Sequence, residues 1–222
     1  PNKKGKSMYG NPLYIKLDGF GITLRPPKSK EEVRSFAVGF SSLEVLWWVG
    51  ATFATTLERE EDWYVNTSDK HDTVTWVIVP DGVDVPVGVT SLSRLDLPHR
   101  SCVSGIVITD RRWWRRGVAY RAHLIRTWYA SQILNMATIQ SFVRDTNPGS
   151  YKALEKVGYV FCGLQLRNCF RDGKYYDTRP YSWLNPNHIP VLYPDGVPTK
   201  YKVSVRKAKE ALEIANINIK KI

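Results

Sequence analysis

A short stretch rich in arginine and tryptophan lies near the middle of the chain, where a loop precedes a predicted helix. Residues 111–120 read RRWWRRGVAY, with four arginines before a Gly-Val-Ala step. Amides at a helix start are unpaired, and the helix dipole makes that end positive. Glycine lets a phosphate approach the backbone, and arginine adds charge-assisted hydrogen bonds. The stretch therefore predicts an anion site that suits a diphosphate, with a solvated basic turn as the alternative.

Periodic patterns beside this stretch predict the elements that position it. Runs of β-branched residues separated by turn residues indicate an antiparallel meander over 73–80, 85–95 and 101–110. From Val118 the apolar residues recur at helical spacing and predict a buried helix. The anion site is therefore expected between the last strand of the meander and the start of this helix.

The other segments complete one α+β domain with a mixed sheet. A hairpin is predicted over 13–27. Helices are predicted over 29–40, 57–68 and 148–158, and strands over 136–145, 159–170 and 174–184. Residues 185–198 hold four prolines and predict a linker or an extended strap. Apolar positions between 205 and 222 share one helical face, so a C-terminal helix docks on the body or on a partner.

Composition limits the class of protein. The 222 residues are 43% hydrophobic and 24% charged, which is typical of a globular soluble chain with one sizeable core. No apolar run is long enough to span a membrane, and the start lacks the apolar region of a secretory signal, so a cytoplasmic protein is expected. Three cysteines without a CxxC pair do not support a metal site, and buried thiols are expected at Cys102, Cys162 and Cys169.

The net charge of +11 is distributed unevenly along the chain. Residues 1–7 carry three lysines, and residues 200–222 carry seven basic residues against two glutamates, so the two ends supply eight of the eleven charges. Basic tails favour loose contact with polyanions such as nucleic acid or a ribosome. The remaining charge lies largely in and after the arginine-rich stretch.

The stretch also resembles a family signature. Residues 114–119, WRRGVA, follow a predicted strand and are similar to the acyl-CoA signature Gln/Arg-x-x-Gly-x-Gly/Ala of the GCN5-related N-acetyltransferase (GNAT) family. Trp114 stands at the Gln/Arg position, which departs from the general family. The Rim-type branch, which comprises ribosomal-protein N-acetyltransferases, commonly has an aromatic-Trp pair there, like Trp113-Trp114.

A second block strengthens the resemblance to that branch. Residues 147–159, NPGSYKALEKVGY, are similar to its N-x-x-S-x-x-x-L-E-K-x-G-F motif, and GITLRPPKSKEEV at 21–33 is similar to its opening strand and helix. The resemblance covers roughly residues 12–184. It implies a GNAT domain over 12–184 with a mixed seven-stranded sheet flanked by helices. Outside that domain the composition indicates a basic tail at 1–11 and a Pro-rich linker with a basic helix at 185–222.

The resemblance implies a site for acetyl-CoA. Strand backbone would pair with the pantetheine arm, the amides from Arg115 to Tyr120 would hold the diphosphate, and Arg111 or Arg112 would reach the 3′-phosphate or stay solvated. Asn147 would bind the pantetheine or only cap a helix. The residues expected at the cofactor are Ile106, Val107, Ile108, Arg111, Arg112, Arg115, Arg116, Gly117, Val118, Ala119, Tyr120 and Asn147.

The implied chemistry is direct attack of an amine on the thioester, which needs an oxyanion donor and a proton for the leaving thiolate. The amide of Val107 is the oxyanion donor by analogy. Many members carry a tyrosine acid where this chain has Leu154, so the expected acid or thiolate stabiliser is Ser150, with Tyr151 behind it.

The general base is the least defined part of the expected site. Many members carry a glutamate on the strand before the anion loop, and here that place falls on Ser104. Asp96 and His99, at the preceding turn, are the fallback candidates, or else plain turn residues.

The sequence therefore predicts an N-acetyltransferase that moves an acetyl group from acetyl-CoA to the N-terminal amine of a peptide or protein. A strongly basic protein is a poor match for polycationic acceptors such as polyamines. Two alternatives stay open: a catalytically weak GNAT-fold module that binds nucleic acid or a protein assembly, and a small-molecule (antibiotic or amino acid) acetyltransferase. An oligomer is compatible with the sequence. Six aromatic residues are available to line the acceptor side or to serve the core: Trp47, Trp48, Trp63, Tyr64, Tyr175 and Tyr176.

Overall fold

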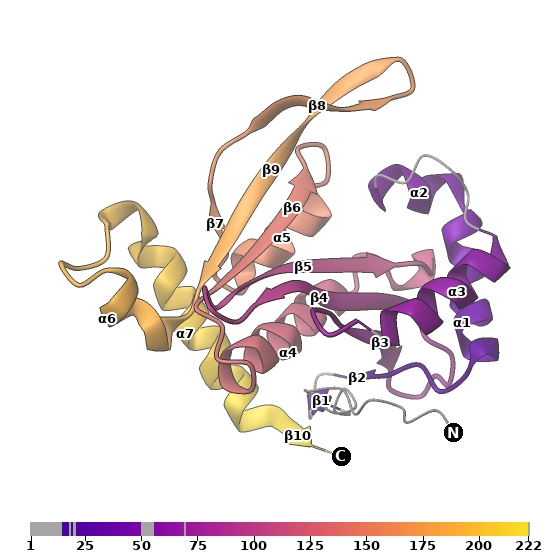
Figure 1. Cartoon of the computed structure of the whole chain (residues 1–222), viewed down its shortest axis with the longest axis horizontal. Helices are drawn as coiled ribbons and strands as arrows, with labels where there is room; N and C mark the ends of the chain where they lie inside the picture. Colours follow the sequence, from indigo (N-terminus) through magenta and orange to yellow (C-terminus); the bar gives the residue numbers. More distant parts are fainter. Residues whose placement is uncertain (1–14, 18, 20, 50–55, 69, 222) are drawn as a thin grey trace.

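The computed structural model describes residues 15–17, 19, 21–49, 56–68 and 70–221 (Figure 1). The expected tail at 1–11 and Ile222 lie outside the described residues. The strands are β1 (Ile15–Leu17), β2 (Ile22–Arg25), β3 (Val74–Pro80), β4 (Gly88–Asp96), β5 (Ser101–Ile108), β6 (Thr138–Arg144), β7 (Val160–Phe161), β8 (Gln165–Arg171), β9 (Lys174–Leu184) and β10 (Ile219–Lys221). The α-helices are α1 (Lys30–Ala37), α2 (Leu43–Val49), α3 (Leu57–Ser68), α4 (Val118–Gln132), α5 (Pro148–Lys156), α6 (Ile189–Leu192) and α7 (Thr199–Asn218).

The described strands form one mixed sheet in the order β10-β1-β2-β3-β4-β5-β6-β9-β7, with β8 paired to β9. The pair β5–β6 is parallel and its neighbours are antiparallel, which confirms the α+β prediction. The sheet has ten strands where seven were expected. The difference includes β10 and the division of the predicted strand 159–170 into β7 and β8, because segments this short carry no readable periodicity.

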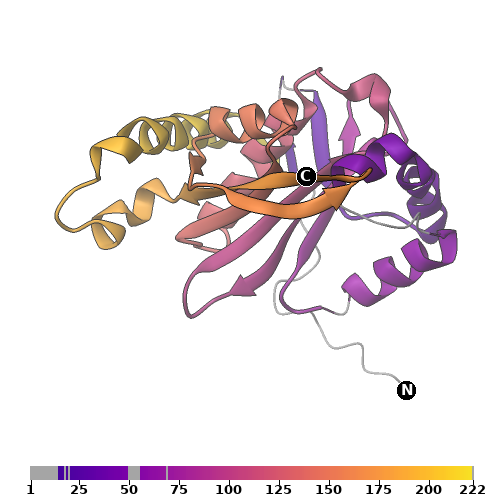
Figure 2. The ribbon, with the colours of Figure 1, turned by 90° about the horizontal axis from the view of Figure 1, so that it is seen from above.

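Helices cover both faces of the sheet. Alternate residues of β3 point to opposite sides: Trp76 and Ile78 enter the main core beneath α4, and Val77 meets Val33 of α1 on the other face. Seen from above, α6 and α7 lie at one end of the molecule and α1 to α3 at the other (Figure 2). None of the described helices is long and apolar enough to cross a membrane.

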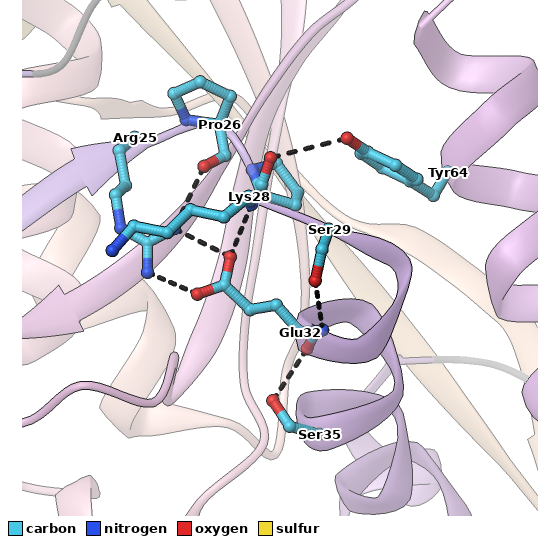
Figure 3. Close-up of polar contacts among 8 residues, drawn as sticks. Arg25, Pro26, Lys28, Ser29, Glu32, Ser35 and Tyr64 are labelled. Carbon is cyan, nitrogen blue, oxygen red and sulfur yellow. Dashed lines mark hydrogen bonds and ion pairs between the residues drawn. The ribbon is translucent and has the colours of Figure 1, made fainter.

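The start of α1 shows why the chain folds as predicted there. Ser29 caps the helix, since its Oγ accepts from the Glu32 amide at 3.2 Å, and the Glu32 carboxylate accepts from the Lys28 amide at 2.7 Å (Figure 3). The same carboxylate binds both terminal nitrogens of Arg25 on β2. Burial acts to raise the pKa of Glu32, but the hydrogen bonds from Arg25 and Lys28 outweigh it and lower that pKa. This pair joins β2 to α1.

The C-terminal helix is part of the main core. Gly158 has φ +94°, and a Cβ there would lie 2.4 Å from the amide nitrogen of Ala208, so α7 packs directly on this glycine. Ala208, Leu212 and Ala215 are buried on the predicted apolar face, and β10 then pairs with β1. The boundary expected after residue 184 therefore separates two segments that share one hydrophobic core.

The three thiols differ in exposure. Cys102 is buried in β5, and burial raises the pKa of its thiol to about 12. Cys169 is partly exposed, and Cys162 is exposed, against the expectation that it is buried. The reason is topological, because Cys162 follows β7, the last strand in the sheet order.

Candidate active site

The two central parallel strands diverge. β5 pairs with β6 only over Ser101–Val103, although β5 continues to Ile108, and Figure 1 shows β6 and β9 leaving the line of β5. We call the gap between residues 104–108 of β5 and 141–144 of β6 the fork. Neither inner edge of the fork is paired with a strand, so its backbone groups, apart from the Ser104 and Ile108 carbonyls that side chains bind, are available to an extended ligand.

Serine side chains bridge the strands where the ladder ends. The Ser104 hydroxyl donates to the Gln140 carbonyl at 3.1 Å, and the Ser141 hydroxyl donates to the Ser104 carbonyl at 3.3 Å. Ser104 is 4% exposed and also contacts the Tyr159 hydroxyl at 3.2 Å. Ser104, at the position where the family commonly carries a glutamate general base, therefore faces the core and joins the strands at the closed end of the fork.

Two of the three expected β5 residues present backbone to the fork. Alternate residues of a strand direct their amides to the same edge. The Thr109 amide donates to Val87 on the β4 side at 2.9 Å, so the Val107 amide faces β4 as well. Ile108 directs its carbonyl to the Trp114 indole at 2.8 Å instead, and Ile106 shares that edge. Because amides alternate in direction along β5, the amides of Ile106 and Ile108 face the open edge. The Val107 amide, expected to be the oxyanion donor, faces β4 instead.

The loop after β5 presents a row of unpartnered amides. Those from Arg115 to Tyr120 have no hydrogen-bond partner within the described part of the chain, and no side chain caps α4. The first bond of the helix runs from the Arg121 amide to the Gly117 carbonyl at 3.1 Å. Arg115 and Gly117 have φ of +59° and +76°, a left-handed alternation that turns successive amides toward one side. We call residues 115–120 the amide nest.

The tryptophans of this stretch hold the loop and its arginines. The Trp114 indole anchors the loop to the end of β5 through Ile108. Arg111 lies over the Trp114 ring and Arg116 over the Trp113 ring, each at 5.7 Å from the ring centroid. Both indoles are partly exposed, and Trp113 also packs against the main core, so each ring carries an arginine at the edge of the core.

The arginines divide into two groups. Arg111 forms an ion pair with Glu44 of α2 at 2.7 Å, and Arg112 with Asp110 at 2.8 Å. The hydrogen bond from Arg112 lowers the pKa of the Asp110 carboxyl. These two, expected at the 3′-phosphate, would have to give up their carboxylates to bind it.

The other group has no acidic partner. Arg115, Arg116 and Arg121 form no ion pair with any described residue. Two guanidinium nitrogens of Arg121 lie 3.9 Å from the position of a Cβ on Gly117, beside the nest. Sequence reasoning did not place Arg121 in the site. Its position one helical turn after Gly117 was the available signal, since residues i and i+4 share a helix face.

The second helix at the fork begins differently. The Asn147 Oδ1 accepts from the Ser150 amide at 3.1 Å and caps α5, while its Nδ2 has no partner among the described residues. The hydroxyls of Ser150 and Tyr151 form no hydrogen bond within the described residues. The guanidinium carbon of Arg179 lies 4.7 Å from the centroid of the Tyr151 ring. Leu154, which stands where other members carry a tyrosine acid, is 1% exposed.

The fallback bases lie elsewhere. Asp96 and His99 are at the β4–β5 turn, at the amino end of β5, and the amide nest follows the carboxyl end. A strand of this length separates them by about 23 Å. The His99 Nδ1 contacts the Asp96 carboxylate at 2.9 Å, and hydrogen bonds from the His99 amide and ring lower the pKa of Asp96. Both residues therefore lie far from the nest, because a hairpin places its turn far from its open ends.

A buried polar cluster lies beneath the fork. Arg126 of α4 is 0% exposed and donates to the Thr90 hydroxyl and the Gly105 carbonyl, each at 2.7 Å. It also contacts His123 Nδ1 at 2.7 Å. Burial, followed by the charge of Arg126, lowers the pKa of His123 well below its usual value. The cluster tethers α4 to β4 and β5 from below.

The aromatic residues expected on the acceptor side separate into groups. The ring of Trp47 on α2 contacts two rings edge to face. Its centroid lies 5.5 Å from that of Tyr176 on β9 and 6.4 Å from that of Trp48. Tyr64 packs on the small cluster around Val77, and its hydroxyl donates to Pro27 at 3.4 Å. Tyr175 is exposed near the tip of the β8–β9 hairpin, and Trp63 is partly exposed on α3. Trp47 and Tyr176 are thus the pair that faces the sheet beside the fork.

No group of three histidine, cysteine, aspartate or glutamate side chains that could hold a metal ion occurs in the described ranges. The features present are backbone amides, guanidinium groups and hydroxyls. They suit a phosphate ester and an amide-rich chain.

Comparison with known proteins agrees with this geometry. A family model described as an acetyltransferase (GNAT) domain matches residues 22–160, which include the fork, the amide nest and α5. The chain has no match among curated proteins. The family match spans more than half of the chain.

Solved structures share the fold at low identity. Spermidine N-acetyltransferase from Vibrio cholerae, solved with CoA and spermine, has a TM-score of 0.68 at 20% identity over 76% of this chain and 98% of that one. A putative acetyltransferase from T. thermophilus has a TM-score of 0.64 at 21% identity over 90% and 99%. A GCN5-related N-acetyltransferase from Brucella melitensis has 0.63 at 17% over 90% and 99%. By its family match, its fold and its fork, the chain belongs to the GNAT superfamily of acetyl-CoA-dependent N-acetyltransferases.

Proposed function

We propose that this chain acetylates the N-terminal amine of a peptide or protein, as enzymes of the Rim-type branch do. The observation that carries the proposal is the amide nest, whose amides are unpartnered and flanked by three arginines without acidic partners. Such a site binds a diphosphate through backbone donors and charge together. Trp113-Trp114 and the motif at 147–159 support the Rim-type assignment.

The residues present fit acetyl-CoA in three places. The amides from Arg115 to Tyr120 hold the diphosphate, with Arg121 and Arg116 beside it. The Ile106 carbonyl and the Ile108 amide, both at the open edge, pair with the pantetheine amides. Asn147 donates from Nδ2, since its Oδ1 is already used in the helix cap. Arg111 and Arg112 stay with their carboxylates and organise the loop.

The reaction requires positioning and two donors. The acceptor ammonium first loses one proton to solvent. The neutral amine nitrogen then attacks the thioester carbonyl carbon, a C–N bond forms, the C–S bond breaks, and the second nitrogen proton that is lost balances the one taken up by the leaving thiolate. The Ile106 amide, at the open edge, donates to the developing oxyanion. Ser150, with Tyr151 behind it, supplies a proton or hydrogen bond to the leaving thiolate, since both hydroxyls lie at the start of α5. The products are an N-acetyl amide, free CoA thiol and a proton.

The acceptor is proposed from charge. The structural neighbour from Vibrio cholerae acetylates spermidine, by its name. This chain carries +11 and buries a further arginine, Arg144, on the acceptor side, which disfavours a polycation. A peptide α-amine on an acidic scaffold fits better. The exposed basic side chains of α7, Lys200, Lys202, Arg206 and Lys209, would then contact a polyanion such as a ribosome.

Calorimetry and a thiol-release assay test the proposal. We expect acetyl-CoA to bind the purified chain and to stabilise it by about 2.7 kcal/mol at a hundredfold excess over Kd. Peptides with free N-termini should then release CoA thiol faster than spermidine or an aminoglycoside. Binding without turnover of any amine would favour the alternative of a GNAT-fold binding module. Faster turnover of spermidine would contradict the peptide assignment.

A further inference from the structure

Arg144, the last residue of β6, is buried without a partner for its charged end. It is 7% exposed, and both terminal guanidinium nitrogens lack a hydrogen-bond partner. Its guanidinium lies over the Trp47 ring at 5.5 Å, and no carboxylate forms an ion pair with it in the described chain. Arginine stays charged at any physiological pH, and burial of an unpaired charge is costly.

The other two buried arginines show what such a residue ordinarily requires. Arg25 binds the Glu32 carboxylate with both terminal nitrogens. Arg126 has the Thr90 hydroxyl, the Gly105 carbonyl and His123 at 2.7 Å each. Arg144 alone among these three has only an aromatic ring, and a cation–π contact replaces part of the lost hydration but no hydrogen bond.

The position of Arg144 relates it to the acceptor side. Along β6 the residues Ile139 and Val143 point into the core beneath α4. Phe142 and Arg144 therefore point to the opposite face, where Phe142 is 46% exposed. Trp47, which contacts Tyr176 of β9, covers Arg144 on this face.

Arg144 also lies at the correct end of the fork. β5 and β6 are parallel, so their carboxyl ends lie together. The amide nest follows the carboxyl end of β5, and Arg144 ends β6 three residues before the Asn147 cap. The carboxyl end of the fork therefore holds a cationic group with unused donors, and because both terminal nitrogens are buried, a ligand reaches them once the Trp47 side chain moves aside.

We propose that Arg144 binds a carboxylate of the acceptor, so that the favoured acceptor is an amine with an acidic group close to its nitrogen. Two parallel N–H donors of a guanidinium match the two oxygens of a carboxylate. In the free chain, Trp47 keeps the guanidinium plane in place. The inference rests on the proposed function and adds the acceptor class to it. The carboxylate belongs to an acidic side chain in the first two residues of a peptide or is the α-carboxylate of a free amino acid.

A double-mutant cycle between enzyme and acceptor tests this proposal. The acceptors are two peptide amides that begin Ser-Glu and Ser-Gln, and the enzymes are the natural chain and Arg144→Met. We expect kcat/KM of the natural chain to be about 30-fold higher for the Ser-Glu peptide, because a charge-assisted pair discriminates by this order. In Arg144→Met the two peptides should react equally. Arg100→Met, an exposed change at the β4–β5 turn, should keep the ratio of the natural chain.

Stability separates a binding role from a structural one. Methionine fills a similar volume and removes an uncompensated buried charge, so Arg144→Met should melt at the same temperature as the natural chain or higher. A lower melting temperature with an unchanged peptide ratio would assign Arg144 to packing and overturn the proposal. If the variant fails to fold, the ratio measured with the natural chain decides alone.

The remaining outcomes distinguish the two sources of the carboxylate. Faster acetylation of serine than of serinamide and both peptides would support the carboxylate site and contradict the peptide acceptor of the proposed function. Equal rates for the Ser-Glu and Ser-Gln peptides, with serine no better than serinamide, would overturn the inference and leave peptide acetylation intact. Absence of acetylation of every amine would overturn both.

Discussion

The two helices that border the fork begin in opposite ways. At the start of α5, Pro148 has no amide, and the Ser150 and Tyr151 amides are bonded to Asn147. At the start of α4, Gly117 supplies no side chain, and the amides through Tyr120 have no partner within the described residues. A helix end without a cap normally costs stability. The difference indicates that α4 leaves its amides for a ligand, whereas α5 binds those of Ser150 and Tyr151 itself.

The anchoring of the helices compensates for this difference. α4 is held from below by Arg126, so its open start does not depend on a cap for its position. α5 is held at both ends, by Asn147 at its start and by the contact of Gly158 with α7 at its end. Each of the following changes alters one side of this comparison.

The largest effect is expected at Gly117. Gly117→Asp would place a carboxylate beside Arg121 and the free amides, where it caps α4 and repels a diphosphate. We expect the Kd for acetyl-CoA to rise about 100-fold, roughly 2.7 kcal/mol, by isothermal titration calorimetry. Gly117→Asn is the matched control, since it imposes a similar strain at φ +76° without the charge and should lose much less affinity. Equal losses for both variants would contradict a charged ligand at this position.

The second effect concerns the end of α5. Gly158→Ala would place a Cβ 2.4 Å from the Ala208 amide nitrogen at φ +94°, so α7 must shift. We expect the free energy of unfolding to fall by about 2 kcal/mol more than in Gly196→Ala, as measured by chemical denaturation. Gly196 has φ +100° with open space around the added Cβ, so that control carries the strain without the clash. Similar losses in both variants would show that α7 does not constrain α5.

The third change separates the cap from the ligand contact at Asn147. Asn147→Ala should cost about 1 kcal/mol of stability, because the Ser150 amide loses its acceptor. Asn147→Asp keeps the cap and should keep the melting temperature, but it replaces the Nδ2 donor and should weaken acetyl-CoA binding several-fold. If Asn147→Asp binds acetyl-CoA like the natural chain, Asn147 serves the cap alone.

The smallest effect concerns the anchor under α4. The folded-state pKa of His123 is lowered, so the unfolded chain binds an extra proton once the pH falls below the unfolded value of about 6.5. Stability present above that value is therefore lost as the pH decreases, by about 1 kcal/mol between pH 6.5 and 5.5. His123→Gln should flatten this part of the curve, whereas His188→Gln, at a less buried histidine with a lowered pKa, should leave most of it. A curve unchanged by His123→Gln would show that this histidine is protonated in the folded state.

Local signals predicted much of this architecture. The Ser29 cap, the meander and the Pro148 start of α5 were predicted because each depends on residues within one turn or one strand. The motif at 147–159 contains residues with distinct structural roles: Asn147 caps, Leu154 is buried, and Gly158 receives α7. Its place at the fork is therefore explained by packing as well as by ligand binding.

Features that depend on distant neighbours were not predicted. The edge to which the Val107 amide points follows from the pairing of β5 with β4, which no local pattern records. Arg111 is alike in sequence to Arg115 and Arg116, and only the position of Glu44, on α2, separates it from them. The guanidinium of Arg144 is covered by the ring of Trp47, which is nearly a hundred residues away in the chain.

Backbone amide hydrogen exchange with and without acetyl-CoA tests the central claim most directly. The account predicts that the amides from Arg115 to Tyr120 exchange quickly in the free chain and become protected on saturation, whereas the Ser150 amide is slow in both states. Saturable binding of acetyl-CoA that leaves residues 115–120 in fast exchange would contradict it.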